Sequence, residues 1–115
     1  MKITDTYVLV DDEHGLYDML KLKERVIALF YASWCPFCVK FLPVFEKHTK
    51  GAGLSFLVVK DDQETMGDRY SVAVVPTVLF FEKGKISRRL DGVLGVGLSE
   101  KMLIDFIDAC ALHER

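Results

Sequence analysis

Residues 26–38 read Val-Ile-Ala-Leu-Phe-Tyr-Ala-Ser-Trp-Cys-Pro-Phe-Cys, an apolar run that leads almost directly into two cysteines. The first six residues show no alternation of polar and apolar side chains, which is typical of a strand buried on both faces. A helix from Pro36 would place Cys35 at the helix N-terminus. There the unpaired backbone N–H groups and the helix dipole favour a thiolate over a thiol. The spacing of Cys35 and Cys38 therefore indicates thiol–disulfide exchange.

The rest of the chain predicts strands and helices in alternation. Strands are expected over residues 7–10, 54–59, 78–81 and 86–90, and further helices over residues 12–22 and 62–70 and from Ser99 onward. The turn at residues 82–85 predicts an antiparallel hairpin of the last two strands. This order of elements predicts an α/β fold, with a central mixed β-sheet flanked by helices on both faces.

Two of the expected helices have recognisable apolar faces. The helix from Pro36 should be interrupted and kinked by Pro43, because proline has no N–H for the helical ladder. Its inward side chains are expected to be Val39, Leu42, Val44 and Phe45. The inward stripe of the last helix is expected to be Leu103, Phe106, Ile107 and Cys110, where Cys110 serves core packing rather than chemistry.

Composition limits the classes of protein and of partner. The chain has 115 residues, 50% of them hydrophobic, which predicts one domain over residues 1–115 that needs no disulfide for its core. A net charge of −2 gives no electrostatic case for binding nucleic acid or an anionic membrane. The first residues lack the pattern of a secretory signal, and no apolar run reaches the roughly 20 residues of a membrane span. We therefore expect a cytoplasmic, reducing location, where a C-x-x-C pair favours a redox role.

Three separated sequence signals together resemble one known family. They are Trp34-Cys35-x-x-Cys38, Pro43 five residues further on, and Val75-Pro76-Thr77 ahead of an expected strand; Gly84 and Gly92 also fall where that family has glycines. The chain resembles the thioredoxin family over nearly its whole length. The resemblance implies a thioredoxin fold with a cis peptide bond before Pro76, and it implies that Pro76 faces the cysteine pair.

The resemblance also implies a mechanism and a set of partners. Cys35 would be the exposed nucleophile that forms a mixed disulfide with the substrate, and Cys38 the buried thiol that resolves it. The substrates would be disulfide-containing proteins, and the electron donor would be thioredoxin reductase or glutathione. The Cys35–Cys38 disulfide would be the only redox group, with no further cofactor. The protein would act as a monomer. Pro36 and Pro43 would shape the site. The implied substrate groove comprises Trp34, Phe37, Val74, Val75, Pro76 and Gly92, with Val75 pairing an extended segment of substrate.

Two positions depart from the common thioredoxin pattern. The residues between the cysteines are Pro36 and Phe37, a pair more similar to glutaredoxins, whose potentials lie about 40–70 mV above that of thioredoxin. We therefore expect a less negative potential, equivalent to about 2–3 kcal/mol in dithiol stability. Leu29 stands where thioredoxins have a buried aspartate that helps to deprotonate the resolving thiol. Without that group, we expect slow release of the mixed disulfide.

Other interpretations of the cysteines remain open. A zinc site needs about four ligands, and His14, His48 and His113 are scattered along the chain. An iron–sulfur cluster bridged by Cys35 between two subunits, a glutathione-dependent reductase and a non-catalytic binding module are the alternatives.

Some residues near the cysteines have simpler explanations. Lys40 either tunes the local potential or is a solvated surface side chain. Asp61, Asp62 and Glu64 are explained by helix capping. Residues 92–97 are interpreted as a flexible connection rather than as a nucleotide site, because no phosphate-loop lysine accompanies their glycines.

Overall fold

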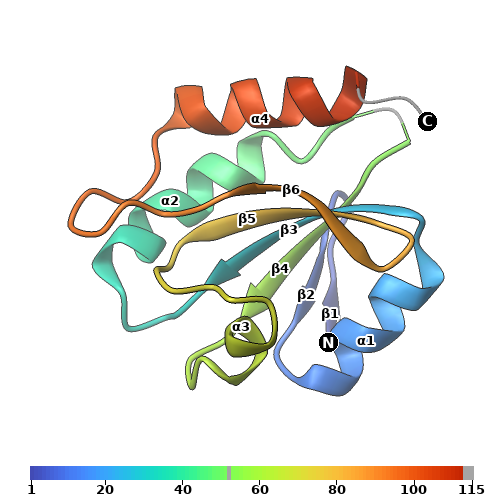
Figure 1. The fold of residues 1–115 in the computed structure, drawn as a ribbon, viewed down its shortest axis with the longest axis horizontal. Helices are drawn as coiled ribbons and strands as arrows, with labels where there is room; N and C mark the ends of the chain where they lie inside the picture. The colour runs from blue at the N-terminus through green and yellow to red at the C-terminus, as the bar shows by residue number, and fades with distance from the viewer. Residues whose placement is uncertain (52, 113–115) are drawn as a thin grey trace.

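A six-stranded mixed sheet forms the centre of the protein in the computed structural model, which describes residues 1–51 and 53–112 (Figure 1). The strand order is β1-β2-β4-β3-β5-β6. Strands β2, β4 and β3 run parallel to one another, whereas β1, β5 and β6 each pair antiparallel with a neighbour. The strands are β1 Lys2–Ile3, β2 Val8–Val10, β3 Arg25–Tyr31, β4 Ser55–Lys60, β5 Thr77–Glu82 and β6 Lys85–Leu90.

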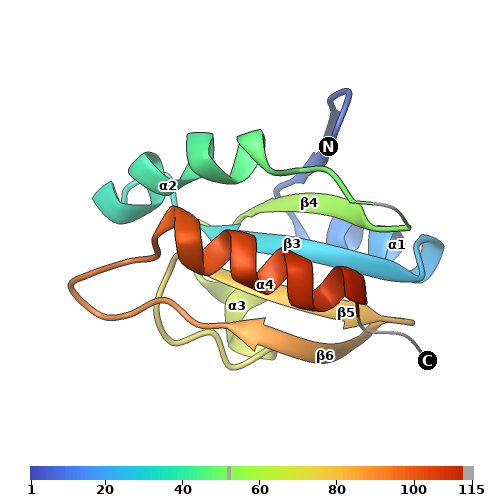
Figure 2. The ribbon, with the colours of Figure 1, turned by 90° about the horizontal axis from the view of Figure 1, so that it is seen from above.

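Helices cover both faces of this sheet. In Figure 1, α2 (Pro36–Lys47) and α4 (Glu100–Leu112) lie above the sheet, and α1 (Glu13–Leu22) and α3 (Thr65–Arg69) lie below it. Figure 2, seen from above, shows α4 in front of β3 and β5. The predicted α/β fold with a mixed central sheet is confirmed, and none of the helices among the described residues has the length and apolar character that crossing a bilayer would require.

Strand β3 joins two separate hydrophobic cores. Ile27, Leu29 and Tyr31 pack with the cysteines and with α2 and α4 on one face. Val26, Ala28 and Phe30 pack with α1 and α3 on the other. Since successive side chains of a strand point to opposite faces, apolar residues at every position are what a strand between two helical layers requires. The lack of alternation in residues 26–31 is thereby explained.

Several predicted elements differ in detail from the structure. Strand β1 was not predicted, because two exposed residues carry no hydrophobic pattern. The predicted helix at 62–70 begins at Thr65, and the buried Asp61 carboxylate accepts hydrogen bonds from the N–H groups of Met66 and Gly67. The β5–β6 hairpin is confirmed, and its two turn residues, Lys83 and Gly84, have φ values of 53° and 80°.

Two predictions about α2 are wrong. The predicted interruption at Pro43 does not occur, because the helix continues across this residue, and its exposed position lets water satisfy the Val39 carbonyl that lost its partner; the kink stays a prediction. Val39 was expected to point inward, but 57% of its surface is exposed, whereas Phe41 is buried with only 3% exposed. The inward face of α2 therefore follows Cys38, Phe41 and Phe45, at the three- and four-residue intervals of a helix.

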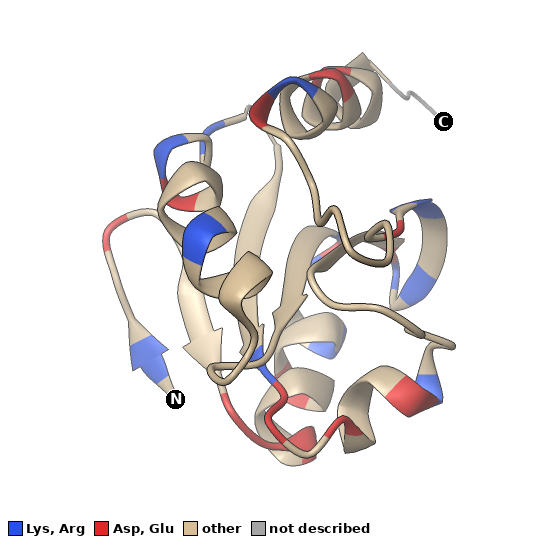
Figure 3. Cartoon of the chain, turned by 90° about the vertical axis from the view of Figure 1, so that its left-hand side faces the viewer, with Lys and Arg blue, Asp and Glu red and all other residues tan. Residues whose placement is uncertain are grey.

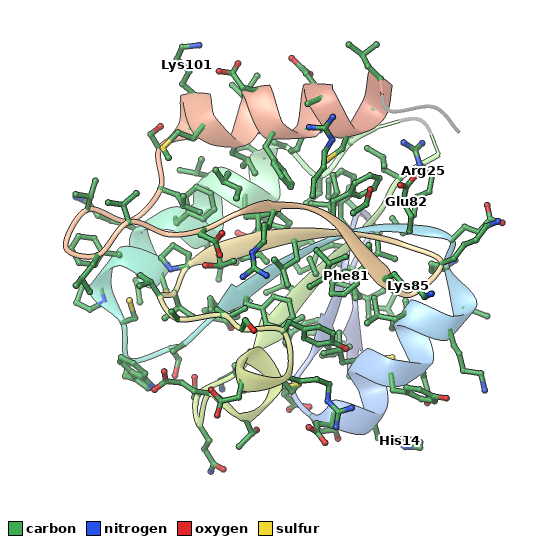
Figure 4. The ribbon with its side chains drawn as sticks, viewed as in Figure 1. His14, Arg25, Phe81, Glu82, Lys85 and Lys101 are labelled. Carbon is green, nitrogen blue, oxygen red and sulfur yellow. The ribbon has the colours of Figure 1, made fainter. Side chains whose placement is uncertain are left out.

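The end of the sheet remote from α2's first turn is tied together by an ion pair. Arg25 and Glu82 are register partners on β3 and β5, and their side chains lie beside each other in Figure 4, with Nε and Oε2 3.7 Å apart. Arg25 also donates from Nη2 to the Cys110 carbonyl oxygen at 2.6 Å, which links this end of the sheet to the last turn of α4. The two cysteines follow the opposite end of β3.

Candidate active site

Cys35 occupies the N-cap of α2, where β3 ends and the chain turns sharply into the helix. Its N–H donates to the Ala32 carbonyl at 3.2 Å, and its own carbonyl accepts from Cys38 and Val39 at 3.0 Å each. Pro36 is the first helical residue, as the sequence predicts. The Cys35 side chain therefore lies at the helix N-terminus, beside the positive end of the helix dipole.

The two thiols have different surroundings. Cys38 is fully buried, and Cys35, expected to be exposed, shows only 7% of its surface. Burial raises the pKa of Cys38 to about 12, and a hydrogen bond with the Cys35 side chain adds to this, although a backbone hydrogen bond to Ala32 opposes it. Cys38 is therefore held as a neutral thiol, and Cys35 is the only one of the pair that a partner can reach.

The loop before β5 covers the cysteine pair, as the resemblance implies. The Val75–Pro76 peptide bond is cis, and Cys35 Sγ donates to the Val75 carbonyl oxygen at 3.7 Å. Thr77 Oγ1 donates to the Val74 carbonyl and accepts from the Gly92 N–H at 3.0 Å. Thr77, which the sequence analysis did not single out, therefore connects this loop to the loop after β6.

Gly92 is required by a close backbone approach. A Cβ at this position would lie 2.2 Å from the Pro76 carbonyl oxygen and 3.3 Å from Val74 Cγ1. Any side chain here must push the Pro76 loop away from its present position.

We expect Gly92→Ala to lower kcat/KM for disulfide reduction by about 10–100-fold, because misplacing a reacting group by about 1 Å has effects of that size. Gly53→Ala is the matched control. It strains a backbone with φ of +74° in the loop before β4, remote from the cysteines, and is expected to cost about 1–2 kcal/mol of stability with unchanged kcat/KM. Equal kcat/KM for Gly92→Ala and the unaltered protein would show that the loop contact has no catalytic importance.

Asp62 anchors the segment immediately before Cys35. Its two carboxylate oxygens accept hydrogen bonds from the N–H and the hydroxyl of Ser33, each at 2.7 Å. Its carbonyl oxygen accepts from Trp34 Nε1 at 2.8 Å. The Ser33 N–H, followed by the Ser33 hydroxyl, holds the pKa of Asp62 below its ordinary value. Helix capping explains Asp61 but is the wrong explanation for Asp62, whose partners lie 28 and 29 residues away in sequence.

The predicted groove residues meet at one edge of the molecule. Trp34 and Phe37 are exposed by 58% and 39%, whereas Val74, Val75 and Gly92 are half-buried and Pro76 is buried. Figure 3 faces this edge, where the ribbon near the start of α2 is mostly uncharged and acidic residues gather on the loops below it. Pro43 lies further along α2 and is not part of this edge.

The remaining sequence candidates fall outside the site. Among the described residues, no cluster of three or more histidine, cysteine or acidic side chains is arranged to hold a metal ion. His14 faces Asp18, His48 faces Glu100, and His113 lies outside the described residues. Cys110 is fully buried, as expected, and burial raises its pKa to about 12.

Leu29 lies in the same buried cluster as Cys38, opposite Val58 and Val78 of the adjacent strands. The position is fully enclosed by apolar side chains.

The fold and the site define an α/β protein with paired cysteines at a helix N-terminus beneath a cis-proline loop. The family model described as thioredoxin matches residues 7–109. The chain belongs to the thioredoxin family.

Individual relatives cover different shares of their own length. A thioredoxin of Acidithiobacillus ferridurans is 27% identical over 110 residues, covering 93% of this chain and 98% of that protein. Protein disulfide-isomerase A5 of Bos taurus is 31% identical over 90 residues, which are 73% of this chain. This chain spans only 17% of that isomerase, and only 46% of chloroplastic thioredoxin Y of Oryza sativa, which is 32% identical over 77 residues, 64% of this chain.

Solved structures share the fold. A mutant thioredoxin from Halobacterium salinarum superposes with a TM-score of 0.76 at 23% identity, covering 100% of both chains. Thioredoxin f from spinach chloroplast superposes with a TM-score of 0.74 at 19% identity, covering 96% of this chain and 98% of that one.

Proposed function

We propose that the protein is a thiol–disulfide oxidoreductase that reduces disulfides in proteins. The observation that carries the proposal is the contrast between the two thiols, since Cys35 lies at a helix N-terminus and Cys38 is enclosed with a pKa of about 12. Membership of a family that includes thioredoxins and protein disulfide-isomerases supports the same conclusion.

The reaction proceeds in two exchanges. The Cys35 thiolate attacks one sulfur of the substrate disulfide, forms a mixed disulfide and expels the other sulfur as a thiolate. Cys38 then loses its proton and attacks Cys35 Sγ, which releases the second substrate thiolate and leaves a Cys35–Cys38 disulfide. Two electrons have passed to the substrate, and an external dithiol or two monothiols return them.

The surface around Cys35 holds the substrate. Trp34, Phe37, Val74, Val75, Pro76 and Gly92 form the contact surface in this proposal, and the backbone at Val75 pairs with an extended segment beside the reacting cysteine. Asp62 keeps Trp34 and Ser33 in place. Net reduction of disulfides requires a reducing compartment, so we propose a cytoplasmic location. We also propose that the protein acts as a monomer.

Insulin reduction with dithiothreitol tests the activity directly. The protein is expected to accelerate insulin precipitation, and the Cys35→Ser variant is expected not to. Replacing dithiothreitol by NADPH with thioredoxin reductase, or by glutathione with glutathione reductase, identifies the donor class. Acceleration only with glutathione would make the protein glutaredoxin-like, and no acceleration with any donor would leave a binding module.

The redox potential should lie above that of a typical thioredoxin because of the Pro36-Phe37 pair. We expect a difference of about 40–70 mV, measured from the fraction of oxidised protein in glutathione buffers of known ratio. Replacing the pair by Gly-Pro is expected to make the potential more negative. If the measured redox potential of the unaltered protein is at or below that of a typical thioredoxin, the Pro36-Phe37 pair does not raise the potential.

A further inference from the structure

The connection between β6 and α4 is a hydrogen-bonded turn beside the active site. The Val93 carbonyl accepts from the N–H groups of Val96 and Gly97 at 2.9 and 2.8 Å, and the Val93 N–H donates to the Gly97 carbonyl at 3.2 Å. Gly95 and Gly97 have φ values of 75° and 85°, which side-chain-bearing residues rarely adopt. The turn therefore has a defined conformation, although the sequence suggested a flexible connection.

This turn packs against the first turns of α2. A Cβ on Gly97 would lie 3.2 Å from Cβ and Cδ1 of Phe37, so the Gly97 backbone packs closely against the Phe37 side chain. Beside this contact lies a groove of about 290 Å³. Its side-chain lining is Phe37, Lys40, Phe41, Val44, Val96 and Leu98.

The groove shares one residue with the reactive edge. Phe37 stands between the two cysteines in sequence and also lines the groove. A polypeptide whose sulfur is bonded to Cys35 and that runs over the exposed start of α2 brings its neighbouring residues to the groove. The volume lies at the lower end of ligand sites, which suits one or two side chains rather than a bulky cofactor.

The lining indicates which side chains fit. Five of the six lining side chains are apolar, so an apolar side chain is buried there at little desolvation cost. Lys40 is the single charged side chain of the lining, it is exposed, and among the described residues it has no hydrogen-bond or ion-pair partner. Its ammonium group is available to a carboxylate of the bound segment.

We propose that this groove is a second subsite for the protein substrate. It receives an apolar side chain a few residues from the reacting cysteine, with an acidic residue of the same segment at Lys40. This inference rests on the proposed function and adds to it a preference among substrates. Glutathione lacks an apolar side chain, so it would use the region around Cys35 without filling the groove.

Matched peptide disulfides test the preference. The probes are short peptides with Leu-Glu, Ser-Glu or Leu-Lys placed two residues from the disulfide cysteine, and hydroxyethyl disulfide serves as a substrate too small to reach the groove. We expect kcat/KM for the Leu-Glu peptide to exceed that of each other peptide by about fivefold or more. Val96→Ser should reduce the Leu over Ser preference to about twofold or less, and Lys40→Glu should reverse the Glu over Lys preference.

Leu94→Ser is the matched control for Val96→Ser. Leu94 is in the same turn and 83% exposed, but it does not line the groove. Val96→Ser and Leu94→Ser should both reduce hydroxyethyl disulfide as well as the unaltered protein, which separates a groove effect from damage to the redox centre. Equal kcat/KM for the three peptides, or equal loss in Val96→Ser and Leu94→Ser, would overturn the subsite.

Binding without turnover distinguishes failure of the subsite from failure of the proposed function. A Leu-Glu peptide carrying S-methylcysteine forms no disulfide, and its binding is followed through Trp34, the single tryptophan of the chain. We expect saturable binding that Val96→Ser weakens at least fivefold and Leu94→Ser leaves unchanged. Absence of this binding, or a groove occupied by a second copy in a dimer that Val96→Ser dissociates, would contradict the proposal even if disulfide reduction is confirmed.

Discussion

Replacing Cys38 with serine is expected to stop turnover after the first exchange and to leave the substrate covalently bound to Cys35. Cys35 keeps its place at the start of α2, so it still attacks a substrate disulfide. The serine hydroxyl does not attack the resulting mixed disulfide, because only a thiolate resolves it at a useful rate. Multiple-turnover reduction of insulin should fall by about 10³-fold or more, since resolution then depends on an external thiol.

Intact-protein mass spectrometry measures this result. Cys38→Ser mixed with an oxidised substrate should gain the mass of one substrate chain, which dithiothreitol removes. Cys110→Ser is the control, because Cys110 is buried at the far end of α4 and plays no part in the exchange. It should remain active and carry no adduct. An adduct on Cys38 in the Cys35→Ser variant would show that the roles of the two cysteines are reversed.

Cys38→Ser also discriminates between the two candidate electron donors, thioredoxin reductase and glutathione. A protein that uses glutathione by a monothiol route would still turn over small glutathione disulfides after Cys38→Ser, since glutathione itself releases the adduct. A dithiol reductase would not. Retention of more than half of the activity would therefore assign the glutathione-dependent function.

Replacing Leu29 with aspartate is expected to accelerate the second exchange. Leu29 lies in the same buried cluster as Cys38, and burial raises the pKa of Cys38 to about 12. A carboxylate there supplies a nearby acceptor for the Cys38 proton. Positioned bases contribute about 10²–10⁴-fold to proton-transfer steps, so we expect at least about a tenfold faster decay of the mixed disulfide at pH 7, measured by acid quench and mass spectrometry.

The pH dependence gives a second signature of the missing base. In the unaltered protein the reactive Cys38 thiolate is formed by deprotonation of a group with a pKa of about 12, so its fraction grows with rising pH. The resolution rate should therefore increase about tenfold per pH unit between roughly pH 7 and 9. Leu29→Asp should flatten this slope above the pKa of the introduced carboxyl, which burial raises, because the ionised carboxylate then accepts the Cys38 proton.

Leu29→Asn is the matched control, since asparagine has nearly the same shape as aspartate but no carboxylate that could accept the Cys38 proton. Both variants replace a fully buried leucine with a polar side chain and should lose about 3–5 kcal/mol of stability. If Leu29→Asp does not fold, resolution in the unaltered protein should still accelerate with the concentration of a basic buffer. Equal resolution rates in the Asp and Asn variants, or no response to buffer, would contradict this account.

The reactive centre could be predicted because its signals are local in sequence. The apolar run of residues 26–31, the proline at the first helical position and the two-residue cysteine spacing each act within one turn or strand. The structure therefore agrees with the expected place of Cys35 and Cys38. The cis peptide before Pro76 was accessible only through family resemblance, since Val-Pro occurs in many conformations.

What could not be predicted depends on contacts between distant segments. The sequence indicated a helix cap at Asp62 because the neighbouring Asp61 is one. No local sequence pattern indicates that the Asp62 carboxylate accepts a hydrogen bond from the N–H of Ser33, 29 residues earlier in the chain. Val39 and Phe41 are both apolar, and only the direction of α2 relative to the sheet decides which is buried. The contact of Gly97 with Phe37 likewise depends on how the last loop crosses α2.

The two borders of the sheet bear on the behaviour of the protein at high concentration. A protein with an apolar reactive edge risks self-association through any strand whose backbone groups are free. Here β1 at one border has only two residues, and β6 at the other carries the exposed cations Lys85, Arg88 and Arg89 beside a register shift at Phe80 and Phe81. Short, charged and irregular borders resist fibril-like stacking, so the exposed apolar side chains near Cys35 do not lead to polymerisation through the strands of the sheet.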